Sequence, residues 1–321
     1  MRIVRIAVSA ALISYLLLKV PLKDVGRALL GARPIWLAVA FTLVGATNLL
    51  AALQMRSILA VQGMRFTLRQ ISAINLVTKF YGLFLPGYLA GGVIRWNHFS
   101  GPEGKRAQAF AAMLFSREVE LLTTIGFGVV FYRLAHTALT ARATFTTLAI
   151  ALAGAVLLVL LSVNERAHRI LLTGLARLPL PRRLQQSAVK ISDCLVDFGR
   201  QGRGHHLPFL ALCIVRNAIG VAAFVCFARA LTVTAPAMDL GWIRALLDLV
   251  AILPVSLAGI GVRDASLVAL LVPMGVTSGA ALALSLLLLG RTLIVALIGG
   301  IVEGARVYSG MQPGFISGRG R

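Results

Sequence analysis

The sequence predicts an all-α polytopic membrane protein, and three observations support this fold class. Hydrophobic residues make up 58% of the 321-residue chain and charged residues only 13%, against about 25% charged residues in an ordinary soluble domain. Several apolar runs approach or exceed the roughly 20 residues with which a helix crosses a bilayer. Two further apolar stretches are interrupted by Pro and Gly. We therefore expect about six full transmembrane helices and two broken or re-entrant elements, in a single domain over residues 1–321.

The predicted full spans are the longest apolar runs, at 3–20, 35–53, 107–132, 144–163, 207–230 and 280–305. The first run follows a charged start, as in a signal peptide. It is long, however, and the charged segment after it lacks a convincing small-residue cleavage site. We therefore expect a retained first helix rather than a cleaved signal.

The two interrupted stretches are 67–94 and 240–277. Proline removes a backbone donor, and glycine lets a ligand or another helix approach closely. Irregular backbone at membrane depth is tolerated where it is buried in protein or lines a wet cavity. We predict a discontinuous or re-entrant element in each stretch, the alternative being that one or both cross the membrane fully.

The chain is strongly basic, with a net charge of +21 from 32 Lys and Arg against 11 Asp and Glu. The basic residues punctuate apolar spans, so anionic lipid head groups, and not nucleic acid, are the expected partners. Residues 164–206 form a basic loop whose apolar residues have the spacing of one helix face, namely Leu184, Ala188, Ile191, Leu195 and Phe198. This helix either lies on the cytoplasmic leaflet or packs on its own domain. A short basic tail follows at 307–321.

The basic loop also predicts the orientation, because cytoplasmic loops collect Lys and Arg. With 164–206 in the cytoplasm, counting spans places both termini there, in a bacterial-type inner or plasma membrane. Segment 95–106 then falls on the same side and the charge-poor segment 231–241 on the other. Loop 21–34, with Lys23, Arg27 and Arg33, falls outside and argues against this orientation.

An internal repeat connects the two interrupted stretches. LPGYLAGGVIR (85–95) and LPVSLAGIGVR (253–263) align without a gap, and six of eleven positions are identical. The shared Pro and Arg carry the most weight, since both are scarce in membrane segments; coincidence in an apolar chain is the alternative. Three predicted spans separate the copies, so the copies belong on opposite faces. That arrangement is an inverted repeat, as in secondary transporters.

Charged residues also fall inside the predicted spans and broken elements. Arg117 and Glu120, three apart, are predicted to pair along one helix, and so are Arg244 and Asp248, four apart. Arg263 and Asp264 are adjacent, and we expect them to point apart. The embedded set holds five cations and four anions: Arg95, Arg117, Arg216, Arg263, Arg291, Glu118, Glu120, Asp248 and Asp264.

These charges have two interpretations. They form ion pairs that only hold the helices together, or they line a polar cavity for a phosphate-bearing head group, which suits the planar fork of arginine. On the second interpretation Arg95 and Arg263 guard opposite mouths, and a proton-coupled role for Glu118 or Asp248 is an alternative. The candidate substrate-binding residues are Arg95, Arg117, Glu118, Arg216, Asp248, Arg263, Asp264 and Arg291.

No catalytic motif stands out in the sequence. Glu118 and Glu120 do not share a helix face, and no Cys, His or acidic residues have the spacing of a metal site. We therefore predict no catalytic residue, metal or cofactor. A membrane-embedded transferase that uses a lipid-linked donor is the enzymatic alternative, and it would need positioned carboxylates or a metal.

Two runs resemble the lysylphosphatidylglycerol synthase transmembrane, or flippase-like, family. NLVTKFYGLFLPGYLAGGVIRW is similar to its first motif, and ILPVSLAGIGVRDASLVALLVPMGV to its second. The resemblance covers nearly the whole chain in outline. It assigns to the first motif Pro86, Gly91, Gly92 and Arg95, and to the second Pro254, Ser256, Gly259, Gly261, Val262, Arg263 and Asp264.

The chain departs from the family pattern at three places. Asp264 stands where the family often has Glu, and Val93 stands where the first motif often has an acid. The family's Glu-Arg pair in the third span appears here as Ser116-Arg117, followed by Glu118.

The resemblance implies a lipid-related function. Its best-known members join this membrane region to an aminoacyl transferase domain, and the membrane region is implicated in flipping the product lipid. We expect a stand-alone member without that domain, because the largest soluble segment outside the spans, 164–206, is too short to form it. The predicted function is a lipid flippase or head-group transporter for an anionic phospholipid or lipid-linked phosphate. A non-catalytic scaffold for a separately encoded lipid-modifying enzyme is the alternative.

Overall fold

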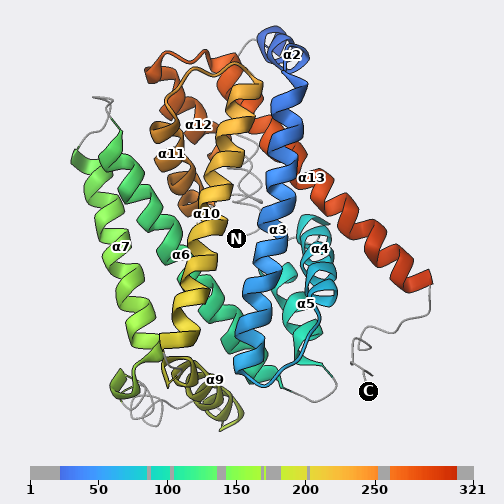
Figure 1. Cartoon of the computed structure of the whole chain (residues 1–321), viewed down its shortest axis with the longest axis vertical. Helices are drawn as coiled ribbons and strands as arrows, with labels where there is room; N and C mark the ends of the chain where they lie inside the picture. The colour runs from blue at the N-terminus through green and yellow to red at the C-terminus, as the bar shows by residue number, and fades with distance from the viewer. Residues whose placement is uncertain are drawn as a thin grey trace.

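The computed structural model describes residues 22–84, 88–101, 105–135, 142–167, 170, 182–200, 203–251 and 261–308. No strand occurs within these ranges, in agreement with the predicted all-α class. The elements, labelled in Figure 1, are α2 (Leu22–Leu30), α3 (Pro34–Val61), α4 (Leu68–Phe84), α5 (Tyr88–Ser100), α6 (Arg106–Leu134), α7 (Arg142–Val163), α9 (Arg182–Arg200), α10 (Arg203–Ala230), α11 (Ala237–Val250), α12 (Val262–Leu271), the 3-10 turn η1 (Val272–Met274) and α13 (Ser278–Tyr308).

Most of the predicted full spans are long apolar helices. In the described part of the chain, four helices are long and apolar enough to cross a membrane: Pro34–Val61, Thr144–Val163, Leu207–Ala230 and Ser278–Arg306. They confirm four predicted spans, although α3 continues to Val61 instead of ending at 53. Helix α6 occupies the predicted span 107–132 but is less apolar, because Arg117, Glu118 and Glu120 lie within it. The predicted span 3–20 lies outside the described residues.

Both interrupted stretches are broken into helix pairs, as predicted. Helix α4 ends at Phe84 and α5 begins at Tyr88; α11 ends at Val250 and α12 begins at Val262. These four helices have 17, 13, 14 and 10 residues. At about 1.5 Å per residue, each is shorter than the roughly 30 Å hydrocarbon core. Figure 1 shows the α4–α5 pair in the half of the molecule that holds α9, and the α11–α12 pair in the opposite half.

Hydrogen bonds between connecting segments define the two ends of the bundle. At one end the Arg33 amide donates to the Ala230 carbonyl over 2.9 Å. At the other end Gln62 Nε2 donates to the Cys194 carbonyl (2.8 Å), and Lys105 Nζ donates to the Gly63 carbonyl (3.3 Å). The loop before α6 and helix α9 therefore share one end, while the loops before α3 and α11 share the other. This is the relative arrangement that the sequence predicts.

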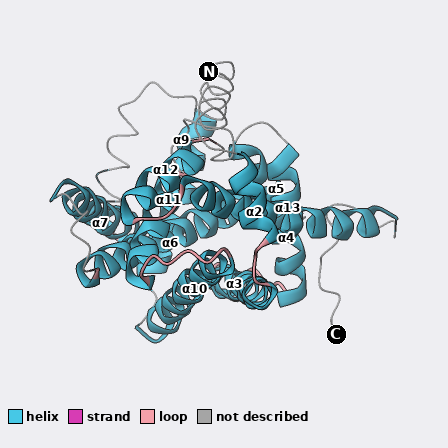
Figure 2. Ribbon diagram, turned by 90° about the horizontal axis from the view of Figure 1, so that it is seen from above, coloured by secondary structure: helices cyan, strands magenta, loops and turns pink. Residues whose placement is uncertain are grey.

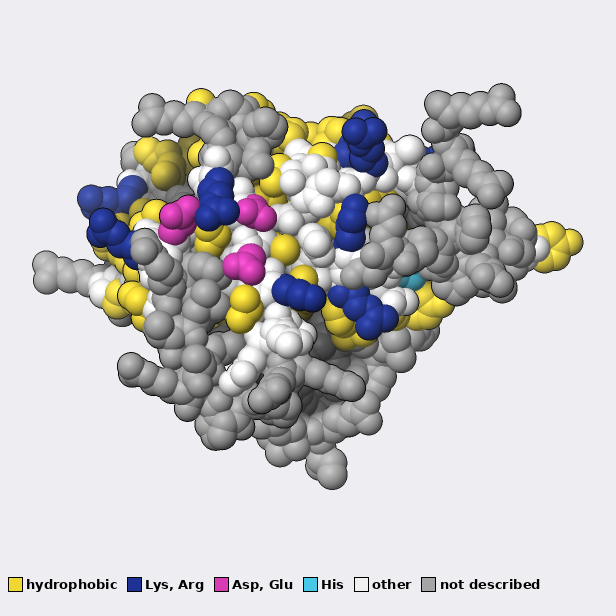
Figure 3. All heavy atoms as spheres, turned by 90° about the horizontal axis from the view of Figure 1, so that it is seen from below, with side chains coloured by type: hydrophobic (Ala, Val, Ile, Leu, Met, Phe, Trp, Pro, Cys, Tyr) yellow, Lys and Arg dark blue, Asp and Glu magenta, His cyan; other side chains and the backbone are white. Residues whose placement is uncertain are grey.

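Helix α9 confirms the amphipathic helix predicted within 164–206. Leu195 and Phe198 are buried, whereas Lys190 is exposed. The Phe198 ring stacks on Phe115 of α6, with ring centroids 4.5 Å apart. The apolar face of α9 thus packs on its own domain, and Figure 3, viewed from this end, shows basic side chains gathered on the surface. The predicted face residue Leu184 has a side chain outside the described set.

The apolar core is divided into two clusters by a polar layer. One cluster contains Val44 of α3 and Phe227 of α10; the other contains Met55 of α3 and Cys213 of α10. Between the two clusters, α3 carries Thr47 and Asn48 and α10 carries Arg216 and Asn217. The same two helices therefore contribute to both clusters and to the polar layer that separates them. Figure 2 shows the bundle from above, with α7 and the C-terminal end of α13 at its periphery.

Candidate functional site

A cavity of about 440 Å³ occupies the layer between the two apolar clusters. Its lining comes from α3, α4, α5, α6, α10, α11 and α13. Each of the four longest described helices contributes a residue close to its own midpoint: Asn48 in α3, Glu120 in α6, Arg216 in α10 and Arg291 in α13. The cavity therefore lies near mid-height in the bundle, where a membrane protein is surrounded by hydrocarbon.

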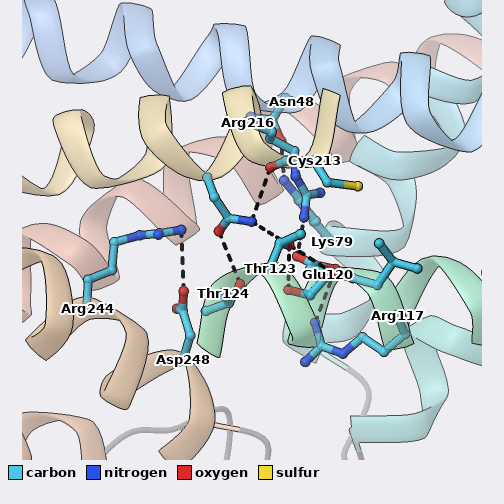
Figure 4. Close-up of polar contacts among 12 residues, drawn as sticks. Asn48, Lys79, Arg117, Glu120, Thr123, Thr124, Cys213, Arg216, Arg244 and Asp248 are labelled. Carbon is cyan, nitrogen blue, oxygen red and sulfur yellow. Dashed lines mark hydrogen bonds and ion pairs between the residues drawn. The ribbon is translucent and has the colours of Figure 1, made fainter. Parts of the chain in front are cut away.

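Glu120 is the central carboxylate of this cavity. Its Oε1 accepts a contact from Arg216 Nη2 at 2.6 Å, and its Oε2 accepts one from Arg117 Nη1 at 3.3 Å. Figure 4 shows the two arginines reaching Glu120 from different helices. The predicted Arg117–Glu120 pair is confirmed, and Arg216 is a second partner that the sequence does not reveal. Charge-assisted contacts of this kind are stronger than neutral hydrogen bonds.

An amide and two hydroxyls fix α10 against α6 beside this ion-pair cluster. Asn217 Nδ2 donates to Thr123 Oγ1 (2.9 Å) and to the Cys213 carbonyl (3.2 Å), while Thr124 Oγ1 donates to Asn217 Oδ1 (3.1 Å). Asn217 is buried and directly follows Arg216. Because buried polar groups are costly unless hydrogen-bonded, these contacts set the rotation of α10 and thereby direct Arg216 into the cavity.

A second ion pair lies on α11. Arg244 Nη2 is 3.3 Å from Asp248 Oδ2, which confirms the predicted pair. A Cβ on Gly220 would lie 2.7 Å from Arg244 Nη2, so the absence of a side chain at this point of α10 makes room for the guanidinium. Figure 4 shows the Arg244 guanidinium directed toward Asp248.

The remaining three cations of the cavity, within the described residues, have no carboxylate at ion-pair distance. Lys79 of α4 donates a hydrogen bond to Asn48 Oδ1. The Arg95 guanidinium of α5 lies 5.5 Å from the centroid of the Phe99 ring, and its buried Nε has no hydrogen-bond partner. Arg291 lines the cavity from α13. Arginine or lysine inside a membrane is costly unless something compensates its charge.

Five of the eight candidate binding residues line this cavity: Arg95, Arg117, Arg216, Asp248 and Arg291. Glu118 does not. Its side chain is on another face of α6, is only 4% exposed, and accepts a hydrogen bond from Ser162 Oγ of α7 at 2.7 Å. The two-residue step from Glu118 to Glu120 is about 200° around a helix, which accounts for the separation.

Arg263 and Asp264 also lie outside the cavity lining, and the expectation that they point apart is wrong. Arg263 Nη2 lies 3.6 Å from Asp264 Oδ1 and donates to the Ser285 carbonyl at 3.3 Å. Asp264 accepts from the Gly261 amide (2.9 Å) and from Ser285 Oγ. Both side chains therefore turn toward α13, where Ser285 engages them together.

Two motif glycines have visible structural roles. Gly91 is buried where α5 meets α4, and a Cβ there would lie 3.1 Å from the Thr78 carbonyl oxygen. Gly261 precedes α12 with φ +87°, a conformation that favours glycine. A Cβ on Gly92 would meet nothing within 4 Å. Pro86, Pro254, Ser256 and Gly259 lie outside the described residues.

The candidate list omits several cavity residues. The sequence contains a signal for Lys79, because Lys79 is the one cation between Arg69 and Arg95 in an otherwise apolar stretch. Glu120 and Arg244 were predicted only as partners in ion pairs. Asn48 and Asn217 gave no signal, because an isolated amide in a membrane helix can face any neighbour until the helix packing is known.

These features define a polytopic membrane protein with a cationic cavity between two broken helix pairs. The chain belongs to the family described as the lysylphosphatidylglycerol synthase TM region, whose model matches residues 2–300. This match confirms the family resemblance and supports a lipid-related membrane function in general terms. No curated protein and no solved structure matches the chain.

Proposed function

We propose that the protein is a lipid flippase or head-group transporter for an anionic phospholipid or a lipid-linked phosphate. The observation that carries the proposal is the cavity at mid-height. In its described lining, six cationic side chains accompany two carboxylates: Lys79, Arg95, Arg117, Arg216, Arg244 and Arg291, with Glu120 and Asp248. Phosphate oxygens are the natural partners of arginine clusters.

The proposed mechanism is alternating exposure of this cavity. The α4–α5 and α11–α12 pairs occupy opposite halves of the bundle. The first pair contributes Lys79 and Arg95 to the lining, and the second contributes Arg244. Movement of one pair would open the cavity toward one leaflet, and movement of the other pair would open it toward the opposite leaflet, as in transporters with inverted repeats. The head group would cross through the polar layer while the acyl chains stay in the bilayer.

The end that carries α9 is proposed to be cytoplasmic, in a bacterial-type inner membrane. That end holds the basic segments around Arg65, Lys105 and Arg200, and the positive-inside rule places such segments in the cytoplasm. Three cations of loop 21–34 lie at the other end, but the α9 end carries the larger number. Both chain termini would then be cytoplasmic.

A scaffold for a separately encoded lipid-modifying enzyme remains the second candidate function. Its supporting observation is that Glu120 and Asp248 are both engaged by arginines of the same chain. A purely structural ion-pair cluster, however, would supply a carboxylate for each cation. Lys79, Arg95 and Arg291 lack one within the described residues, and this favours the transporter.

The test is lipid scrambling in proteoliposomes. Full-length protein would be reconstituted with labelled anionic and zwitterionic lipids, beside Arg95→Ala and Arg291→Ala variants. Arg200→Ala is the matched control, because Arg200 is 64% exposed and lies on α9, away from the cavity. We expect movement of anionic lipid that both cavity variants lower at least tenfold and the control leaves unchanged. No movement of any lipid, with or without a proton gradient, would favour the scaffold.

A further inference from the structure

The charge balance of the whole chain restricts what the cavity can bind. The sequence contains only 11 Asp and Glu, and two of them, Glu120 and Asp248, line the cavity. These two are shared among three cations: Arg117 and Arg216 contact Glu120, and Arg244 contacts Asp248. The formal charge of the described lining is therefore +4, six cations less two carboxylates.

The other acidic side chains are engaged or located elsewhere. Glu118 faces Ser162, Asp264 faces Gly261 and Ser285, Glu303 pairs with Arg306, and Asp239 accepts from Trp242. Glu165, Asp193 and Asp197 belong to the end of the bundle that holds α9. Asp24 belongs to α2 at the other end, although its side chain is not described.

Glu103 lies outside the described residues, two positions before Lys105, whose ammonium donates to the Gly63 carbonyl at the α9 end. Three undescribed segments, 1–21, 85–87 and 252–260, contain no Asp or Glu in the sequence. No undescribed part of the two helix breaks can therefore contribute a carboxylate to the cavity.

An excess of positive charge near the membrane centre needs an anionic partner, because burying uncompensated charge is expensive. A phosphodiester brings one negative charge. A terminal phosphomonoester or a diphosphate brings about two near neutral pH. The three cations without a carboxylate come from three helices, α4, α5 and α13, so they can approach one ligand from several directions.

Building on the proposed function, we infer that the cavity selects a head group with at least two negative charges, a terminal phosphomonoester or a diphosphate. A cavity of about 440 Å³ is in the usual range for a small polar head group. A lysyl ester head group, which carries two ammonium groups against one phosphate, would meet like charges in this cavity. The electrostatics thus disfavour the cationic lipid from which the family takes its name.

The test is a binding measurement on the full-length protein in detergent at about pH 8, where a phosphomonoester carries close to two charges. The probes are short-chain phosphatidate and phosphatidylglycerol, which share their acyl chains and differ in head-group charge. Affinity is read from the ligand-dependent rise in the thermal unfolding midpoint. We expect phosphatidate to bind about tenfold tighter or more, because it gains one further Coulomb interaction in a partly buried site.

Lys79→Gln and Arg291→Gln are the test variants, with Arg200→Gln as the exposed control. Each test variant should reduce the preference for phosphatidate, and each should unfold at the same or a higher temperature without ligand, because it removes like-charge repulsion. The ligand-free midpoint reports folding, so loss of binding is separable from loss of structure. Equal affinities of wild type for the two lipids, or an unchanged preference in both test variants, would overturn the inference.

Competition with inorganic pyrophosphate distinguishes a lipid head group from a free anion as the doubly charged ligand. Competition by pyrophosphate only at much higher concentration than phosphatidate supports a lipid head group. Tighter binding of pyrophosphate than of phosphatidate supports the doubly charged ligand but assigns it to a free anion.

Scrambling separates this inference from the proposed function. A binding preference without scrambling supports the inference and removes the transport proposal. Equal scrambling and equal binding of both lipids supports transport and overturns the inference.

Discussion

The two broken helix pairs both pack on α13, but different parts of each pair make the contact. Helix α4 of the first pair packs against Gly299 and Gly300, and a Cβ at Gly300 would lie 2.7 Å from the Phe80 ring. Helix α12 of the second pair is held by polar contacts of Arg263 and Asp264 with Ser285. The first pair therefore combines close packing at glycines, as is common between membrane helices, with hydrogen bonds between Tyr81 and Glu303 and between His98 and Arg306. In the second pair the motif residues Arg263 and Asp264 themselves make the hydrogen bonds to α13.

The two arginines at aligned positions of the repeat also have different surroundings. Arg95 in the first pair lines the cavity and has no carboxylate at ion-pair distance in the described structure. Arg263 in the second pair is occupied by Asp264 and the Ser285 carbonyl. The repeat thus places a cation in the helix after each break, and in the second pair the contact with Ser285 of α13 holds that cation outside the cavity lining.

The largest effect on stability is expected from Gly299→Ala, which disrupts the close packing of α13 against α4. The new methyl group would clash with the Leu76 backbone of α4, and backbone cannot rotate away as a side chain can. Overpacking typically costs about 1–3 kcal/mol. We expect a clear fall in the thermal unfolding midpoint in detergent. Gly304→Ala is the control, since nothing lies within 4 Å of a Cβ there; equal midpoints for the two variants would contradict the packing.

Asp264→Ala removes the hydrogen bond between α12 and Ser285 of α13. We expect it to have the next largest effect on stability. It removes the acceptor for the Gly261 amide and for Ser285 Oγ, and both of these donors belong to buried residues. We expect a loss of about 1–3 kcal/mol in the free energy of unfolding, measured by thermal unfolding. Asp197→Ala, in an exposed ion pair with Arg200, should cost less than about 1 kcal/mol. A larger loss for Asp197→Ala than for Asp264→Ala would refute this assignment.

The contrast between Arg95 and Arg263 predicts opposite outcomes for the same substitution. Arg263→Ala should lower stability by about 1–2 kcal/mol, because it removes a hydrogen bond to the Ser285 carbonyl and the cation beside Asp264. Arg95→Ala should change stability little, because it relieves repulsion among the cavity cations while losing packing on Phe99. Scrambling should behave in the reverse way, with Arg95→Ala the more damaging per folded molecule. If the two variants changed stability equally and also changed scrambling equally, the proposed difference between Arg95 and Arg263 would be wrong.

Much of the fold can be predicted from the sequence, because a helix that crosses the bilayer must be long and apolar and hydropathy measures this directly. The apolar runs that became α3, α7, α10 and α13 are visible without any tertiary information, and Pro with Gly reveals where 67–94 and 240–277 are interrupted. Pairs within one helix, such as Arg117 with Glu120, are equally accessible because helix geometry alone brings them together.

The cavity was only partly predictable, because its composition depends on how each helix is rotated relative to its neighbours. Arg216 of α10 contacts Glu120 of the neighbouring helix α6. Asn217 fixes the rotation of α10 through hydrogen bonds to two threonines that are 93 and 94 residues away in the sequence. Arg263 was expected to point away from Asp264, but Ser285, on another helix, engages both. None of these partners lies at a helical spacing that a single sequence displays.

The smallest effect is expected within α6, where the same contrast between a cavity side chain and an internally satisfied one recurs over two residues. Glu118→Gln keeps an oxygen that can accept from Ser162 Oγ and removes no cationic partner from the described structure. The unfolding midpoint and the scrambling rate should both stay near those of the wild type. Glu120→Gln is the matched comparison, because it deprives Arg117 and Arg216 of their shared carboxylate. If Glu118→Gln abolished scrambling while Glu120→Gln did not, transport would depend on the buried Glu118 carboxyl beside α7 and not on the cavity. That result would contradict the proposed role of the cavity in lipid transport.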